Sequence, residues 1–170
     1  MDVKFVNPFV QAIGNVFRTM VQTEVTIGRP HMKADPAAPT DVTGIIGLSG
    51  DVTGSVVLSF QLESAVAIAS KFAGTDVEPD HPDFADALGE LANMVAGNAK
   101  KDFHGYVVNI SLPSVIIGQG HKVSASHVAP QLVIPCDCPL GSFAVEVSVE
   151  TDKQRSVTPS MASAEAGAGQ

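Results

Sequence analysis

The sequence predicts an α/β fold of two layers, in which a mixed or antiparallel sheet carries two long helices on one face. Apolar residues recur every three or four positions in three segments, as in amphipathic helices, and short β-branched runs lie between them. The chain has 170 residues, enough to bury a core without disulfides or metals. We expect one domain over residues 1–150. Residues 151–170 are small and polar, so we expect a disordered tail there.

Local signals mark where the helices begin and end. Asn7 is a possible N-cap for the first helix, and Pro8 suits its first turn. Gly74 is placed to end the second helix, which is short and which we expect at the edge of the sheet. The apolar stripes predict helices over about residues 7–20, 62–72 and 82–104.

The remaining segments predict strands and turns. Gly and Asp cluster between residues 45–48 and 55–60, as a hairpin requires. Residues 28–40 hold three prolines and are expected to form a loop. The first helix with its hairpin resembles the third helix with the strands after it, which predicts a pseudo-repeat of two helix-plus-strands halves. The other expected strands are residues 23–27, 106–112, 115–118, 132–135 and 142–149.

Composition argues against several classes of function. Asp and Glu number 18 against 10 Lys and Arg, for a formal net charge of −8, which repels phosphate backbones and anionic membranes. Trp is absent, so little is available for stacking on bases. Neither a signal peptide nor a membrane span is visible. Cys136 and Cys138 are too close for an unstrained disulfide, which favours reduced thiols and a cytoplasmic location.

The third helix has two contrasting sides when its residues are placed about 100° apart. Phe84, Leu88, Leu91, Val95 and Ala99 fall on one side. A polar stripe falls on the other side, at steps of three and four residues: Asp86, Glu90, Asn93, Gly97, Lys100 and His104. An ordinary solvated face explains such a stripe. It does not explain a glycine, which costs about 1 kcal/mol relative to alanine inside a helix.

The same residues give the chain a resemblance to a known family. Asp86, Glu90 and Asn93 lie in the string DALGELANMVAGNAKKDF, and Pro113 follows in NISLPSVIIG. The opening NPFVQAIGNVF also matches that family's first helix. Over roughly residues 5–150, the chain resembles the CheX branch of the CheC/CheX/FliY chemotaxis phosphatases.

The resemblance implies an enzyme that ends a chemotaxis signal by hydrolysing the aspartyl phosphate of a response regulator, CheY or a relative. Its catalytic pair would be Glu90 and Asn93. An amide accepts a hydrogen bond from water and also donates one, so Asn93 would position the attacking water. Glu90 would pair with the receiver's phosphate-binding lysine. No cofactor of its own is expected, because Mg²⁺ is held by the receiver.

The resemblance also assigns supporting roles and an assembly. Asp86 and Pro113 are expected to be structural members of the motif, and Gly97 and Lys100 to contact the partner. The family adds a homodimer, formed by pairing of edge strands. Aligning the first helix with the third places Asn15 opposite Asn93 and Ala12 opposite Glu90. Because the first helix lacks the acid, we expect one site per chain.

Other functions remain open at this stage. A non-catalytic module that binds a receiver or a flagellar switch component would use the same stripe, and a purely structural dimerisation module would leave it unexplained. The five histidines lie in different segments without the paired spacing of zinc ligands, so no metal site is expected.

Overall fold

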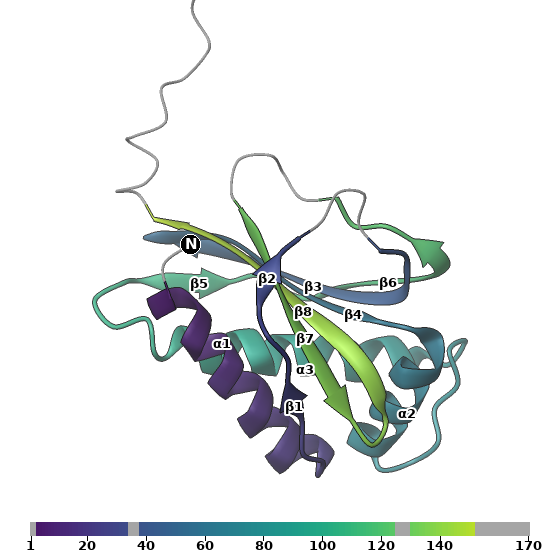
Figure 1. Ribbon diagram of the computed structural model, residues 1–170. Coiled ribbons are helices and arrows are strands. Elements are labelled where there is room, and N and C mark those ends of the chain that lie inside the picture. The colour runs from purple at the N-terminus through teal and green to yellow at the C-terminus, as the bar shows by residue number, and fades with distance from the viewer. Residues whose placement is uncertain (1–2, 34–37, 125–129, 152–170) are drawn as a thin grey trace, which may run out of the picture.

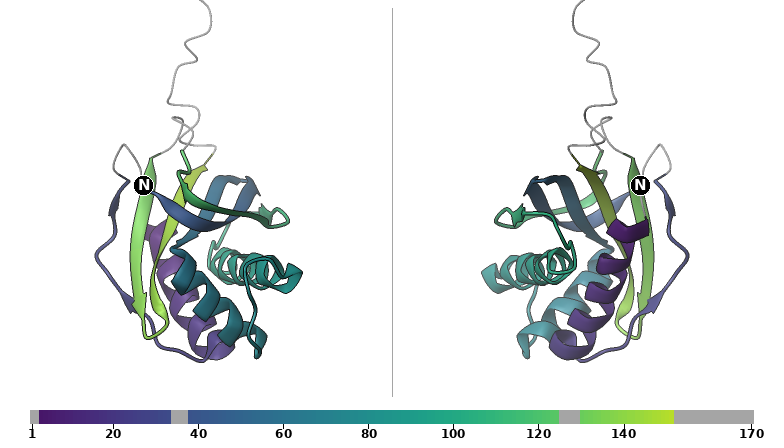
Figure 2. Two further views of the ribbon diagram at one scale, coloured as in Figure 1. Left: turned by 90° about the vertical axis from the view of Figure 1, so that its right-hand side faces the viewer. Right: turned by 90° about the vertical axis from the view of Figure 1, so that its left-hand side faces the viewer.

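An eight-stranded sheet carries three helices on one face in the computed structural model of this chain (Figures 1 and 2), which describes residues 3–33, 38–124 and 130–151. Every strand pairing in it is antiparallel, so the predicted fold class is confirmed. No helix in these ranges is long and apolar enough to span a membrane. The helices are α1 (Val3–Val16) with a π-helical turn (Phe17–Val21), α2 (Leu62–Ala73) and α3 (Pro82–Lys100).

The strands follow a repeated arrangement, as predicted. Their order across the sheet is β1-β7-β8-β4-β3-β5, with β2 also beside β7 and β6 also beside β3. Within the described ranges, each half has a long helix followed by four strands, and α2 lies between the halves. The first two strands of each half pair with a strand of the other half. The strands are β1 (Thr26–Ile27), β2 (His31–Met32), β3 (Thr40–Gly50), β4 (Val52–Phe60), β5 (Val108–Ile110), β6 (Ser114–His121), β7 (Gln131–Cys138) and β8 (Gly141–Thr151).

The predicted hairpin is formed by β3 and β4. Gly50 closes it at φ +105°, and a Cβ there would lie 2.4 Å from the carbonyl oxygen of Val107, so only glycine fits. The predicted loop over residues 28–40 contains a short strand, β2, which pairs with Leu132 and Val133. Residues 34–37 of that loop lie outside the described ranges, as does the expected tail except for Thr151, which ends β8.

The first helix begins at Val3, so Asn7 is inside the helix and is not its N-cap. Phe5 explains the difference, because its ring is buried and lies 5.6 Å from the rings of both Phe103 and Tyr106. Pro8 lies inside the helix and cannot donate to the carbonyl four residues earlier. Aromatic packing far away in the sequence thus extends the helix past its proline.

The other two helices also differ from expectation at one point each. Gly74 ends α2 in a left-handed conformation, as predicted, but α2 packs on β8 and β3 near the centre of the sheet, not at its edge. The third helix ends at Lys100, so His104 lies outside it. Phe103 is buried against Phe5 and Phe9, which draws the chain away from the helical path.

A carboxylate from the sheet caps the N-terminus of α2. Gln61 makes no side-chain cap, and Asp41 of β3 instead accepts a hydrogen bond from the N–H of Leu62 at 3.0 Å. Its other oxygen accepts from the N–H of Gly120 at 2.9 Å. The bond from Gly120, and then that from Leu62, lowers the pKa of Asp41 below its usual range. One side chain therefore joins β3, α2 and the end of β6.

Asp41→Asn is expected to lower the midpoint of urea unfolding at about pH 7, because an amide offers one acceptor where two N–H groups need one each. The folded-state pKa is lowered, so the carboxylate stabilises the fold above its unfolded-state pKa of about 3.9 and this contribution is lost as pH falls through the folded-state value. The difference between variant and wild type should shrink as the pH is lowered towards 3 or so. A difference that stays constant, or that matches Asp80→Asn on the exposed α2–α3 connection, would contradict this role.

Candidate functional site

The side chains of α3 separate into a buried and an outward face, as its sequence predicts. The expected apolar side is buried throughout: Phe84, Leu88, Leu91, Val95 and Ala99. It packs against α1, α2 and the central strands. On the opposite side, Asp86 and Glu90 are exposed, and Asn93, Gly97 and Lys100 are half-buried. The structure therefore brings a carboxylate and an amide to one accessible stripe.

The connection from β5 to β6 runs alongside this stripe. Cδ1 of Ile110 lies 3.8 Å from the position that a Cβ on Gly97 would take, and Cγ of Pro113 lies 3.3 Å from the same position on Gly89. Gly89 and Gly97 are about two helical turns apart, and Asn93 is midway between them. Residues 111 and 112 therefore pass α3 at the level of Asn93.

Hydrogen bonds to β3 hold this connection in place. The N–H of Ser111 donates to the carbonyl of Gly47 at 2.9 Å, and the N–H of Gly47 donates to the hydroxyl oxygen of Ser111, also at 2.9 Å. That hydroxyl donates in turn to the carbonyl of Leu112 at 2.7 Å. β6 begins directly after Pro113 and pairs with β3. The site thus lies between two elements that are held in place, the helix α3 and the segment 110–113.

A groove of about 530 Å³ lies between the first turns of α3 and the start of β6. Three members of the expected motif line it, namely Asp86, Glu90 and Pro113. The sequence reasoning missed Gly89, which also lines the groove. The signal was available, because a glycine inside a helix needs a reason wherever it occurs. Here the reason is the close approach of Pro113, which leaves little room for a side chain.

Glu90 and Asn93 contact one another. Nδ2 of Asn93 donates to Oε2 of Glu90 at 3.5 Å, at the long end of the hydrogen-bond range. This contact turns the amide NH₂ group towards the carboxylate and leaves the amide oxygen to accept from another donor. A bond this long is weak, so a cation that approaches Glu90 can replace it.

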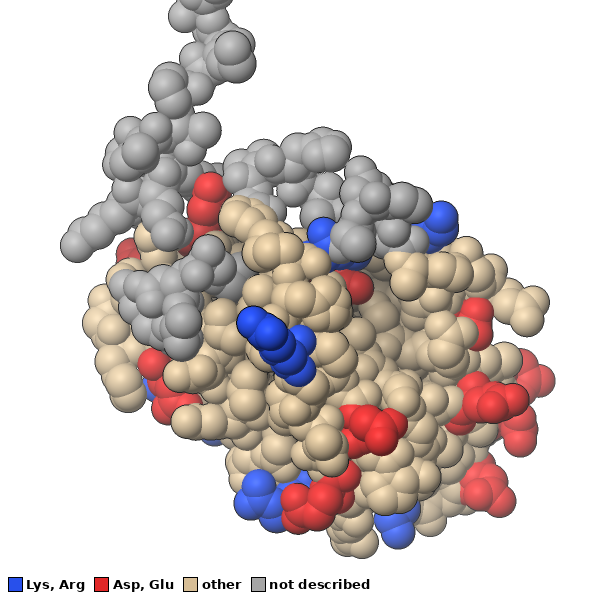
Figure 3. Space-filling model, in the orientation of Figure 1, with Lys and Arg blue, Asp and Glu red and all other residues tan. Residues whose placement is uncertain are grey.

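Charge is unevenly distributed around the site. Asp86 and Glu90 continue an acidic run from the α2–α3 connection, where Asp76, Glu78 and Asp80 are exposed. Figure 3 shows acidic side chains at the right-hand edge of the molecule, where Figure 1 places the connection between α2 and α3. This distribution favours a partner with a positively charged surface and would speed its approach.

The first helix does not repeat the site. Ala12, at the position that corresponds to Glu90, is 4% exposed, and Pro8, at the position of Asp86, is also buried. Asn15 is exposed, as expected from its spacing. The positions of α1 that correspond to the accessible stripe of α3 are therefore mostly buried.

Other reactive groups are poorly placed for chemistry. Cys136 and Cys138 are free and buried, and burial raises the pKa of Cys136 to about 12, so it is not a thiolate at neutral pH. Burial also raises the pKa of Cys138. Within the described ranges, no group of three or more His, Cys, Asp or Glu side chains is arranged to hold a metal ion.

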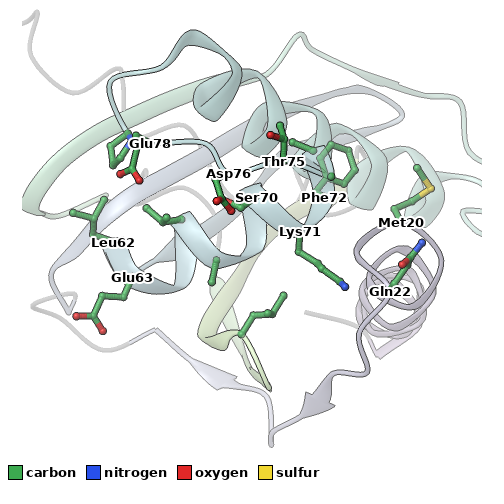
Figure 4. Close-up of a pocket in the computed structure, with 16 residues that line it drawn as sticks. Met20, Gln22, Leu62, Glu63, Ser70, Lys71, Phe72, Thr75, Asp76 and Glu78 are labelled. Atoms are coloured by element: carbon green, nitrogen blue, oxygen red, sulfur yellow. The ribbon is translucent and has the colours of Figure 1, made fainter.

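A larger hollow of about 1060 Å³ lies on a different part of the molecule (Figure 4). Its lining comes from α2, the α2–α3 connection, the end of the π-helical turn and Leu140 in the turn between β7 and β8. Lys71 is its basic residue, and its acids are Glu63, Asp76 and Glu78. It contains neither Glu90 nor Asn93, so size alone does not identify the site.

Comparisons with known proteins identify the family of the chain. The sequence profile of the family described as "Chemotaxis phosphatase CheX" matches residues 42–137, a range that includes Glu90, Asn93 and Pro113. A relative from Thermotoga maritima, named CheY-P phosphatase CheX, is 29% identical over 137 residues, which cover 79% of this chain and 88% of the relative.

Solved structures show the same likeness. A CheC-like superfamily protein from Shewanella sp. PV-4 has a TM-score of 0.80 and 32% identity, over 88% of this chain and 99% of that one. A chain in the CheX–CheY–BeF₃–Mg²⁺ complex from Borrelia burgdorferi has a TM-score of 0.75 and 28% identity, over 86% of this chain and 97% of that one. The chain described here belongs to the CheX family of chemotaxis phosphatases.

Proposed function

We propose that this chain accelerates hydrolysis of the aspartyl phosphate on a CheY-like receiver domain, with Glu90 and Asn93 as its catalytic pair. The observation that carries the proposal is the contact between these two side chains on the outward stripe of α3, beside a groove that Pro113 also lines. Family membership and the names of the relatives support the same reaction. Termination of a chemotaxis signal is its biological context.

The chain contributes the position of a water molecule, not a nucleophile. The receiver supplies the phosphoryl group and Mg²⁺, and the complex from Borrelia burgdorferi contains Mg²⁺ with CheY and BeF₃. The amide oxygen of Asn93 accepts a hydrogen bond from the water and directs its lone pair in line with the phosphorus–oxygen bond that breaks. The two buried cysteines cannot act as nucleophiles in place of water.

Glu90 fixes the docking geometry. Its carboxylate pairs with the receiver's phosphate-binding lysine, and this charge pair strengthens as docking excludes water. The long contact to Asn93 is then released, and the amide NH₂ becomes free to donate to the attacking water or to the phosphoryl group. Asp86 and Pro113 support the groove, while Gly97 and Lys100 lie further along the stripe where the receiver would rest.

The assembly and location form part of the proposal. β6 lies at an edge of the sheet and, among the described residues, pairs only with β3. Ile116 and Ile117 on this strand are 41% and 44% exposed, which favours pairing with a second copy in a homodimer. Two free cysteines favour the reducing cytoplasm. The acidic net charge argues against nucleic acid and anionic membranes as partners.

Asn93→Ala is expected to reduce the accelerated decay of the phosphorylated receiver by on the order of 10²-fold or more, while binding is largely kept, because water positioning matters only in the transition state. The matched control is Asn15→Ala on α1, where the neighbouring acid is replaced by the buried Ala12. Decay of a labelled phosphoreceiver, measured with both variants, checks the assignment.

Equal losses in the two asparagine variants would contradict a single site per chain. Wild-type decay with Asn93→Ala would contradict the mechanism. The alternative of a receiver- or flagellar-switch-binding module without catalysis would bind the phosphoreceiver and leave its decay unchanged even in the wild type.

Glu90→Gln is expected to weaken binding to the beryllofluoride-activated receiver by roughly 2–5 kcal/mol, because the receiver's lysine would be left unpaired in the interface. The matched control is Asp86→Asn, one turn earlier and also exposed. Its effect should be small and should disappear at high salt, because it acts only at long range. Calorimetric titration at two salt concentrations separates the two roles, and equal effects in both variants would remove the specific pair.

Gly97→Ala is expected to change stability and docking in opposite directions. The nearest side-chain atom from outside the helix is Cδ1 of Ile110, 3.8 Å from the new Cβ, which is ordinary contact, so the chain itself has room for alanine. The free energy of unfolding of the variant should exceed that of the wild type by up to about 1 kcal/mol. Docking of the receiver should weaken if the glycine keeps the helix surface clear for it. Unchanged docking in a stabilised variant would exclude Gly97 from the interface.

A further inference from the structure

We propose that Leu112 is an apolar docking contact for the receiver and sets how firmly it is held over Asn93. This inference rests on the proposed function, since it takes the receiver to be the molecule that covers the stripe of α3. It adds a contact outside the Glu90–Asn93 pair, supplied by the segment 110–113 rather than by the helix.

Leu112 is unusually accessible for its type. Its side chain is 88% exposed, more than any other large apolar side chain that the structure describes; Val107 follows at 68%. Single exposed apolar residues are common on protein surfaces, so exposure alone carries no conclusion. Its position does, because residues 111 and 112 pass α3 at the level of Asn93.

The backbone of Leu112 is held on both sides. Before it, Ser111 exchanges two hydrogen bonds with Gly47 and donates a third to the carbonyl of Leu112. After it, Pro113 lies over Gly89, with its Cγ 3.3 Å from the position that a Cβ would take, and β6 begins. The leucine is thus held in place beside the site, and its contact with a partner would cost little ordering of the backbone.

The geometry selects the receiver as the occupant. For the phosphoryl group to come within hydrogen-bond distance of Asn93, the surface around the phosphorylated aspartate must approach α3 and the adjoining segment together. Leu112 must then be covered by that surface. The complementary feature is an apolar patch beside the phosphorylation site of the receiver, opposite the lysine that Glu90 binds.

The test measures the decay of a phosphorylated CheY-like receiver from the same organism over a range of receiver concentrations, with the full chain. Leu112→Ala should raise KM by about tenfold, the loss expected from a leucine side chain that is buried on docking, and should leave kcat nearly unchanged. Leu112→Asp should raise KM further, and Leu112→Met should stay close to wild type. Val107→Ala is the matched control, because Val107 is exposed but lies before β5, at the other end from residues 111–113. Its KM should not change.

The outcomes distinguish this inference from the proposed function. If Asn93→Ala abolishes the acceleration but Leu112→Ala and Leu112→Asp keep the wild-type KM, the docking contact is overturned and the phosphatase mechanism stands. If the wild-type chain accelerates the decay of no receiver, both are overturned. The mass of each variant in solution is measured alongside. A change of oligomeric state in Leu112→Asp would place the leucine between copies of the chain and overturn its role in receiver docking.

Discussion

The packing of Pro113 against Gly89 is the contact on which the candidate site depends. A Cβ on Gly89 would lie 3.3 Å from Cγ of Pro113, so the glycine lets the β5–β6 connection approach α3 one residue before Glu90. Without it, the carboxylate and the amide would stand on an open helix surface, with nothing beside them to orient a partner. The hydrogen bonds between Ser111 and Gly47 tie the same connection to the sheet. The site is therefore built where one helix and one strand connection meet over β3.

The two halves of the chain share one architecture but differ in the side chains that their long helices expose. Among the described residues, each half has a long helix followed by four strands, with α2 between the two halves. Each half contributes two strands that pair with a strand of the other half. In the first half, Pro8 and Ala12 are buried, whereas Asp86 and Glu90 at the corresponding positions of the second half are exposed. The π-helical turn at residues 17–21 further distinguishes α1 from α3. The repeat supplies the scaffold, and we propose that the exposed acids and the amide of one helix supply the chemistry.

Sequence reasoning could predict what depends on local pattern. The stripe on α3, the hairpin of β3 and β4 and the glycine that ends α2 follow from spacing and turn chemistry. The misplaced boundaries have distant causes, because Phe5 and Phe103 meet in space although they are far apart in the chain. The position of residues 111 and 112 beside the site also depends on contacts that are distant in the chain. Helical spacing together with the family resemblance identified Glu90 and Asn93, but no local pattern shows that residues 111 and 112 lie beside them.

In the proposed mechanism the chain positions water and never carries the phosphoryl group itself. A single-turnover experiment tests this directly, with labelled phosphoreceiver mixed with an excess of the chain and quenched over time. Label should pass directly from the receiver to inorganic phosphate, at a rate that saturates once all of the receiver is bound by the chain. Label that appears on the chain before it reaches inorganic phosphate would contradict this mechanism. A decay rate of the phosphoreceiver that does not change with the concentration of the chain would also contradict it.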